Sequence, residues 1–174
     1  MNDQIMKATY EALLSVTNIR FFETERGYQG EFVSHLRNNL FQRGIVNDHV
    51  ILEEEYQKQY VHNTHLRPDI ILHIPREASG AIPQENNFAV WALKLRATPK
   101  KARDDLEKLE TMFTQLNYPL GIFINISANR TLLNLYHGEY AERIVGFAVK
   151  KENESIAIWQ SLISNGVVIT DRLT

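Results

Sequence analysis

Two apolar segments decide the fold of this chain: "RPDIILHI", residues 67–74, and "FAVWALKL", residues 88–95. Both are short and rich in branched aliphatic or aromatic residues, which predicts buried β-strands over 69–74 and 88–95. The stretch between them, "PREASGAIPQENN", holds two prolines and a Ser-Gly pair. Such residues break regular structure, so residues 75–87 are predicted to form a loop between the strands.

The segments on either side of these strands alternate between helical and extended patterns. Apolar residues recur every three to four positions over 30–43 and 99–116, which predicts two amphipathic helices, and the first ~45 residues are largely helical. Further segments are expected as follows: strands at 50–60, 120–126, 144–150 and 155–161, and a short helix at 131–135. The order predicts an α/β fold in which a mixed sheet is flanked by helices and a crossover helix joins two buried strands.

Composition limits the classes of function. The chain has 174 residues, 44% of them hydrophobic, which suits a single domain, 1–174, with its own core. It has no cysteine, which excludes disulfides, thiolate zinc sites and cysteine nucleophiles. No leader-like or membrane-spanning run is visible, so we expect a cytoplasmic protein without a membrane partner. The net charge of −2 by itself argues against a broad nucleic-acid-binding surface.

The residues with the potential to act in catalysis lie on the two predicted strands 69–74 and 88–95. Pro68-Asp69 opens the first strand, and the second contains Ala92, Leu93 and Lys94. Because side chains alternate along a strand, residues 92 and 94 share a face, and adjacent strands would bring Asp69 and Lys94 together. A carboxylate can hold Mg²⁺, and a lysine beside it can act on an attacking water or on phosphate charge. This pattern suits metal-assisted cleavage of a phosphodiester bond.

These motifs resemble those of the PD-(D/E)xK nuclease superfamily, which has the restriction-endonuclease-like fold with an αβββαβ core. The similarity covers about residues 28–128; the N-terminal helix and a C-terminal α+β segment lie outside it. The resemblance implies Mg²⁺ (or Mn²⁺) bound by Asp69 and the backbone carbonyl of Leu93, with Lys94 as a catalytic residue. It also implies a supporting catalytic and metal-binding glutamate on the first core helix, for which Glu31 is the candidate. A structural role explains Glu31 equally well, because a carboxylate near a helix N-terminus interacts favourably with the helix dipole.

Ala92 departs from the family pattern, which has Asp or Glu two residues before the lysine. A methyl group cannot bind a metal, so position 92 marks a missing catalytic carboxylate. Three explanations stay open: an engineered replacement of glutamate, natural loss of the site, or migration of the carboxylate to Glu31 or another acid. The surroundings of Ala92 keep the family pattern, which favours the first, so this chain is expected to be an inactivated nuclease.

Basic residues gather near the predicted site and are candidates for contacts with phosphate: Arg67, Arg96, Lys100, Lys101 and Arg103. These basic residues are explained equally well as the solvent-exposed face of an ordinary amphipathic helix. The expected substrate is nucleic acid, DNA in preference to RNA, in a restriction, repair or antiviral defence setting. So small a catalytic domain is expected to use a homodimer or a partner protein to recognise its target. The alternative function is a non-catalytic nucleic-acid-binding or assembly subunit that retains the nuclease fold.

Overall fold

The computed structural model describes residues 1–54, 68–75 and 86–174. Within these residues, seven strands form one sheet and follow one another across it in chain order. They are β1 (Ile51–Glu54), β2 (Ile70–His73), β3 (Asn87–Leu95), β4 (Gly121–Ile126), β5 (Ile144–Glu152), β6 (Ser155–Ser164) and β7 (Val167–Arg172).

The sheet is mixed, with a parallel centre and antiparallel edges. β3, β4 and β5 run parallel, while β1 and β2 on one side and β6 and β7 on the other pair antiparallel. Parallel neighbours need a crossover connection, and α4 (Pro99–Leu116) supplies it between β3 and β4. The predicted mixed sheet with a crossover helix is confirmed.

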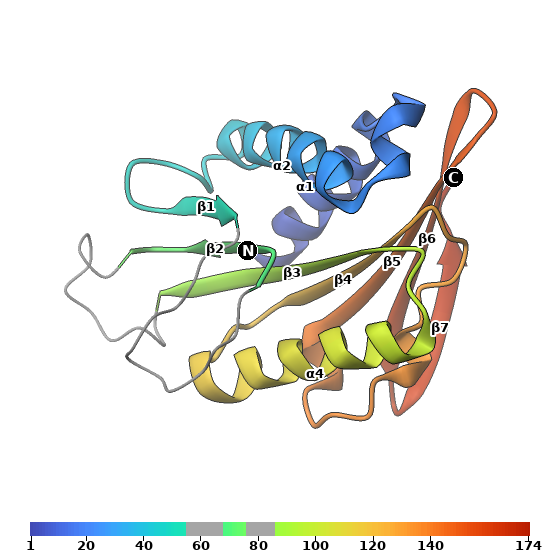
Figure 1. Ribbon diagram of the computed structural model, residues 1–174. Helices are drawn as coiled ribbons and strands as arrows, with labels where there is room; N and C mark the ends of the chain where they lie inside the picture. The colour runs from blue at the N-terminus through green and yellow to red at the C-terminus, as the bar shows by residue number, and fades with distance from the viewer. Residues whose placement is uncertain (55–67, 76–85) are drawn as a thin grey trace.

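Helices cover both faces of the sheet (Figure 1). α1 (Asn2–Ser15) and α2 (Glu25–Gln42) pack together on one face, joined by the 3₁₀ helix η1 (Ile19–Glu23), and α4 lies on the other. Two further 3₁₀ segments, η3 (Leu133–Leu135) and η4 (Ala141–Arg143), stand between β4 and β5. Within the part of the chain that the structure describes, no helix combines the length and apolar character needed to cross a bilayer.

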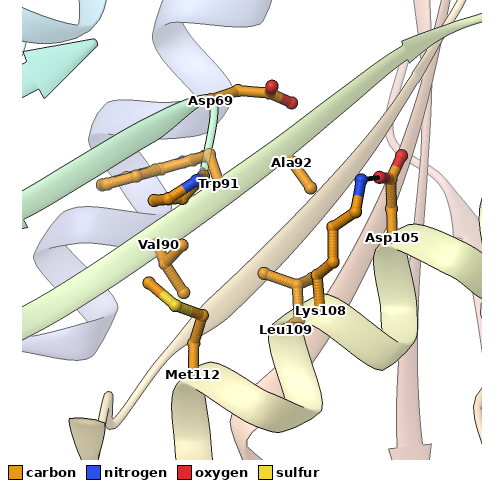
Figure 2. A pocket seen from close by; sticks show the side chains of 9 residues that line it. Asp69, Val90, Trp91, Ala92, Asp105, Lys108, Leu109 and Met112 are labelled. Atoms are coloured by element: carbon orange, nitrogen blue, oxygen red, sulfur yellow. Dashed lines mark hydrogen bonds and ion pairs between the residues drawn. The ribbon is translucent and has the colours of Figure 1, made fainter. Parts of the chain in front are cut away.

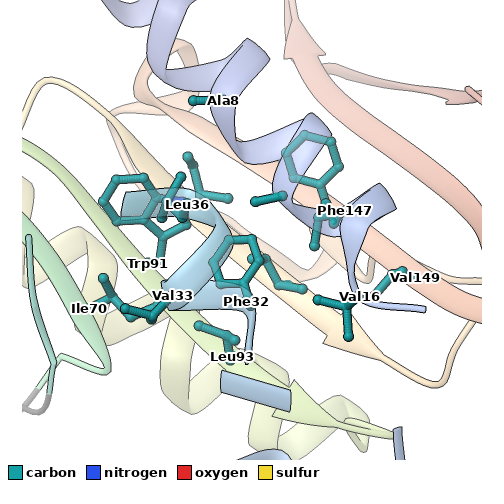
Figure 3. Packing of buried hydrophobic residues seen from close by; sticks show 14 of the residues in the cluster. Ala8, Val16, Phe32, Val33, Leu36, Ile70, Trp91, Leu93, Phe147 and Val149 are labelled. Atoms are coloured by element: carbon teal, nitrogen blue, oxygen red, sulfur yellow. The ribbon is translucent and has the colours of Figure 1, made fainter. Parts of the chain in front are cut away.

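Alternation along β3 divides the core into two layers. Trp91 and Leu93 are fully buried with α1 and α2, as the close view of this cluster shows (Figure 3). Val90 and Ala92 join the other cluster, under α4. Position 92 therefore faces α4, and Lys94, two residues further on, leaves the strand on that side.

Local signals set the bounds of the two long helices. α4 begins at Pro99 after Thr98, whose hydroxyl accepts a hydrogen bond from the Lys101 amide at 3.3 Å. α2 begins at Glu25 because Thr24 caps it, accepting from the Gly27 amide at 3.1 Å. Gly44 takes a left-handed conformation, φ +68°, just after α2, as expected where a helix stops.

Most predicted elements are confirmed and some bounds shift. α4 occupies the predicted residues, and β2, β3 and β4 fall within about a residue of their predicted positions. α2 begins five residues before the predicted start at residue 30. The short helix predicted at 131–135 is one 3₁₀ turn, and β7 was not predicted. Residues 55–60 of the first predicted strand and 76–85 of the predicted loop lie outside the described residues.

Phe32→Ala tests how strongly the α2 face holds the fold together. Phe32 is fully buried, so we expect the free energy of unfolding to fall by about 3–5 kcal/mol, as for other buried Phe→Ala changes. The matched control on the same helix is Phe41→Ala, because Phe41 is 62% exposed; it should change stability by less than about 0.5 kcal/mol. Urea unfolding followed by circular dichroism measures both, and equal losses would contradict this assignment of the core.

Candidate functional site

Asp69 and β3 are joined directly. Asp69 stands immediately before β2, whose first residue, Ile70, is paired with Trp91. This register brings the Asp69 side chain to the middle of the second motif, where Oδ2 accepts a hydrogen bond of 2.7 Å from the amide of Leu93. Gln29 of α2 donates to the Asp69 carbonyl at 3.3 Å. The predicted convergence of the two motifs is therefore present.

The Lys94 ammonium lies among oxygen atoms from three elements. Nζ donates to the Leu93 carbonyl at 2.9 Å and to Glu25 Oε1 at 3.1 Å, and it lies 3.3 Å from Asp105 Oδ2. The second oxygen of Glu25 accepts from the amide of Leu95 at 3.0 Å. Glu25 comes from α2 and Asp105 from α4, so carboxylates from both faces of the sheet meet at the end of β3.

Asp105 is the most deeply buried acid of this group. Its side chain is 3% exposed, and its Oδ1 lies 2.7 Å from Lys108 Nζ. Its Oδ2 faces Lys94 but makes no hydrogen bond to the described residues. Asp105 and Asp69 line one small cavity of about 20 Å³ together with Ala92. Figure 2 shows the two carboxylates on either side of Ala92.

Burial and charge perturb both motif residues. Burial raises the pKa of Asp69 above its ordinary value, although the hydrogen bond from Leu93 and the charge of Lys94 oppose the shift. For Lys94, burial alone would lower the pKa, but Asp105, Asp69 and Glu25 together outweigh it and raise the pKa. Lys94 is therefore an ammonium at neutral pH and acts as a donor and a positive charge.

The structure places Glu25, rather than Glu31, beside Lys94. Glu31 lies more than one turn further along α2, is 36% exposed, and pairs with His35 at 3.3 Å. The reason is the start of the helix: Thr24 caps α2, so its first residue is the acid that reaches the end of β3. A sequence signal existed in the pair Thr24-Glu25, which is typical of a helix start.

The predicted phosphate-contacting residues divide into two groups. Those that the structure describes are all exposed and follow Lys94 into the first turns of α4: Arg96, Lys100, Lys101 and Arg103. Among the described residues, none of them makes an ion pair. Arg67 lies outside the described residues. The exposed group therefore offers positive charge next to the candidate site.

The donors around Lys94 have the chemistry of a site for a hard cation. Carboxylates and a backbone carbonyl are the oxygen ligands that Mg²⁺ prefers, and one buried carboxylate oxygen lacks a hydrogen bond. Over residues 1–54, 68–75 and 86–174, no three His, Asp or Glu side chains are grouped closely enough to hold a metal ion as they stand. The cation now among these oxygens is the Lys94 ammonium, so a metal ion would compete with it.

Lys94→Met should destabilise the fold by about 1–3 kcal/mol near neutral pH, because it removes the ammonium that pairs with Glu25 and faces the buried Oδ2 of Asp105. The raised pKa of Lys94 means that its charge stabilises the fold below the ordinary lysine pKa and that this benefit is lost as pH rises through the folded value. Exposed Lys101→Met is the control, and equal unfolding energies for the two variants would refute the ion network.

Comparisons with known proteins give no relative for this chain. No family model matches it, and neither a curated protein nor a solved structure shows a significant match.

Proposed function

We propose that the chain is a Mg²⁺-dependent nuclease with a restriction-endonuclease-like core, and that it hydrolyses phosphodiester bonds, in DNA rather than RNA. One observation carries the proposal: the Asp69 carboxylate and the Lys94 ammonium hydrogen-bond to the amide and the carbonyl of the same residue, Leu93. The side chains of Asp69 and Lys94 thus contact the backbone of the same residue, at the edge of the sheet where β2 begins and β3 ends. This is the arrangement that the motif resemblance requires.

Each group has a role that follows from its charge and position. Asp69 and the Leu93 carbonyl would hold the metal ion, which when bound supplies charge for a scissile phosphate and acidity for a coordinated water. Lys94 donates hydrogen bonds and positive charge to the phosphate oxygens as negative charge develops on them. Because its pKa is raised, its first role is charge stabilisation rather than removal of a proton from water.

The surface beside the site supports a nucleic-acid substrate. Arg96 and the basic residues that open α4 are exposed close to Lys94, so they are free to contact phosphates flanking the scissile bond. The net charge of −2 gives no broad attraction to nucleic acid. Target recognition therefore calls for a second copy of the chain or a partner protein.

A second candidate function is a non-catalytic subunit that keeps this fold and binds nucleic acid or assembles with other proteins. The observation in its favour is the ion network itself. Lys94 is already paired with Glu25 and Asp105, and position 92 offers only a methyl group. In that case Lys94 and its acids stabilise the end of β3 and take no part in chemistry.

Cleavage assays distinguish the two functions. Supercoiled plasmid, linear single-stranded DNA and single-stranded RNA are incubated with Mg²⁺, Mn²⁺ or EDTA and with the wild-type chain or Ala92→Glu. We expect metal-dependent cleavage of DNA by at least one of these two proteins. Asp69→Asn and Lys94→Ala, made in whichever protein is active, should lower the rate about 100-fold or more, since each removes a charge that acts on the reacting phosphate.

Lys101→Ala is the matched control, because Lys101 is exposed and lies about one turn of α4 before Asp105. It should change binding of DNA, visible as a salt-dependent loss of affinity, far more than the rate at saturating substrate. Failure of both the wild-type chain and Ala92→Glu to cleave any substrate with either metal would reject the nuclease and favour the non-catalytic subunit.

A further inference from the structure

We infer that Asp105, from helix α4, supplies the carboxylate that position 92 lacks, and that Asp69 and Asp105 together bind a divalent cation of the Mg²⁺ class. This inference rests on the proposed function and deepens it, because it assigns the missing ligand to a residue outside both sequence motifs. It selects migration of the carboxylate among the three explanations for Ala92 and makes the chain, as it stands, competent to bind metal.

The fold brings Asp105 to the place that a longer side chain at position 92 would reach. Ala92 belongs to the cluster on the α4 side of the sheet. A glutamate there would extend toward α4, into the cavity that Asp69, Ala92 and Asp105 line together. Asp105 enters the same space from the opposite wall. Lys108 also lines this cavity, and its ammonium lies against Asp105 Oδ1 (Figure 2).

The burial of Asp105 sets it apart from the other acids of α4. Asp104 and Glu107 are exposed, as expected on the polar face of an amphipathic helix, whereas the Asp105 side chain is 3% exposed. A buried carboxylate costs stability unless it is fully paired. Lys108 satisfies Oδ1, whereas Oδ2 makes no hydrogen bond to the described residues and has only the Lys94 ammonium facing it, at 3.3 Å. A metal ion that displaces this ammonium would meet a carboxylate oxygen with no hydrogen bond to lose.

The position of the Lys94 ammonium indicates which ligand fits. A cation already lies against the Leu93 carbonyl, a Glu25 oxygen and Asp105 Oδ2, at 2.9, 3.1 and 3.3 Å. Those are oxygen donors only, and no nitrogen or sulfur ligand takes part, which suits Mg²⁺ or Mn²⁺. The Lys94 side chain is 20% exposed and has a flexible stem, so it can move aside when a divalent cation binds.

Binding of Mn²⁺, followed by the electron paramagnetic resonance signal of the free ion, tests this assignment without using activity. Five proteins are compared: wild type, Asp105→Asn, Asp104→Asn, Ala92→Glu and the double variant Ala92→Glu/Asp105→Asn. We expect wild type and Asp104→Asn to bind equally and Asp105→Asn to bind about 10-fold or more weakly, as for loss of a metal-site carboxylate. The double variant, which returns the carboxylate to β3, should recover most of the affinity, and Mg²⁺ should displace Mn²⁺.

Circular dichroism confirms that each variant is folded, and the exchange of carboxylate for amide keeps the shape of residue 105. Equal affinity of wild type and Asp105→Asn overturns the inference. The inference is also overturned if the wild type fails to bind Mn²⁺ while Ala92→Glu binds Mn²⁺ and cleaves DNA. That result would leave the proposed nuclease function standing and would identify Ala92 as the residue that inactivates the chain. If neither protein binds Mn²⁺ and neither cleaves, the proposed function and the inference fail together.

Discussion

The ion network around Lys94 is the interaction on which the rest of the site depends. Helices α2 and α4 lie on opposite faces of the sheet, yet Glu25 from one and Asp105 from the other both reach the same ammonium at the end of β3. Asp69 joins the group through the amide of Leu93. Three acids this close together repel one another, and the positive charge of Lys94, with that of Lys108 on Asp105, offsets the repulsion where both helices meet the sheet.

The packing of α4 on β3 suggests a physical reason for a small residue at position 92. Positions on the α4 side of β3 must leave room for the helix, and alanine leaves room for a carboxylate carried by the helix itself. If Asp105 binds a metal ion as we infer, it supplies from α4 the carboxylate that the motif has at position 92. Burial of the Asp105 carboxylate costs stability, and its ion pairs with Lys94 and Lys108 offset that cost in either of the two proposed functions.

The sequence was sufficient for the buried central strands and the crossover helix, because apolar strands and an amphipathic helix carry strong periodic signals, and the adjacency of β2 and β3 then brings Asp69 to Lys94. It did not predict β7, which is short and mostly exposed. It was not sufficient for the acids that come from the helices. Glu31 was the candidate because the predicted helix started at residue 30 and so left Glu25 outside it; the Thr24 cap decides the actual start. Asp105 looked like part of a solvated charge run with Asp104; only the packing of α4 on β3 shows that one is buried and the other exposed.

The most direct test of the shared metal site is a crystal structure of the wild-type chain grown with Mn²⁺, with diffraction recorded at the manganese absorption edge. We predict an anomalous peak coordinated by Asp69 and Asp105, with the Lys94 ammonium displaced from its present partners. Full occupancy by Mn²⁺ elsewhere on the chain, or no peak while Lys94 still contacts Glu25 and Asp105, would contradict it.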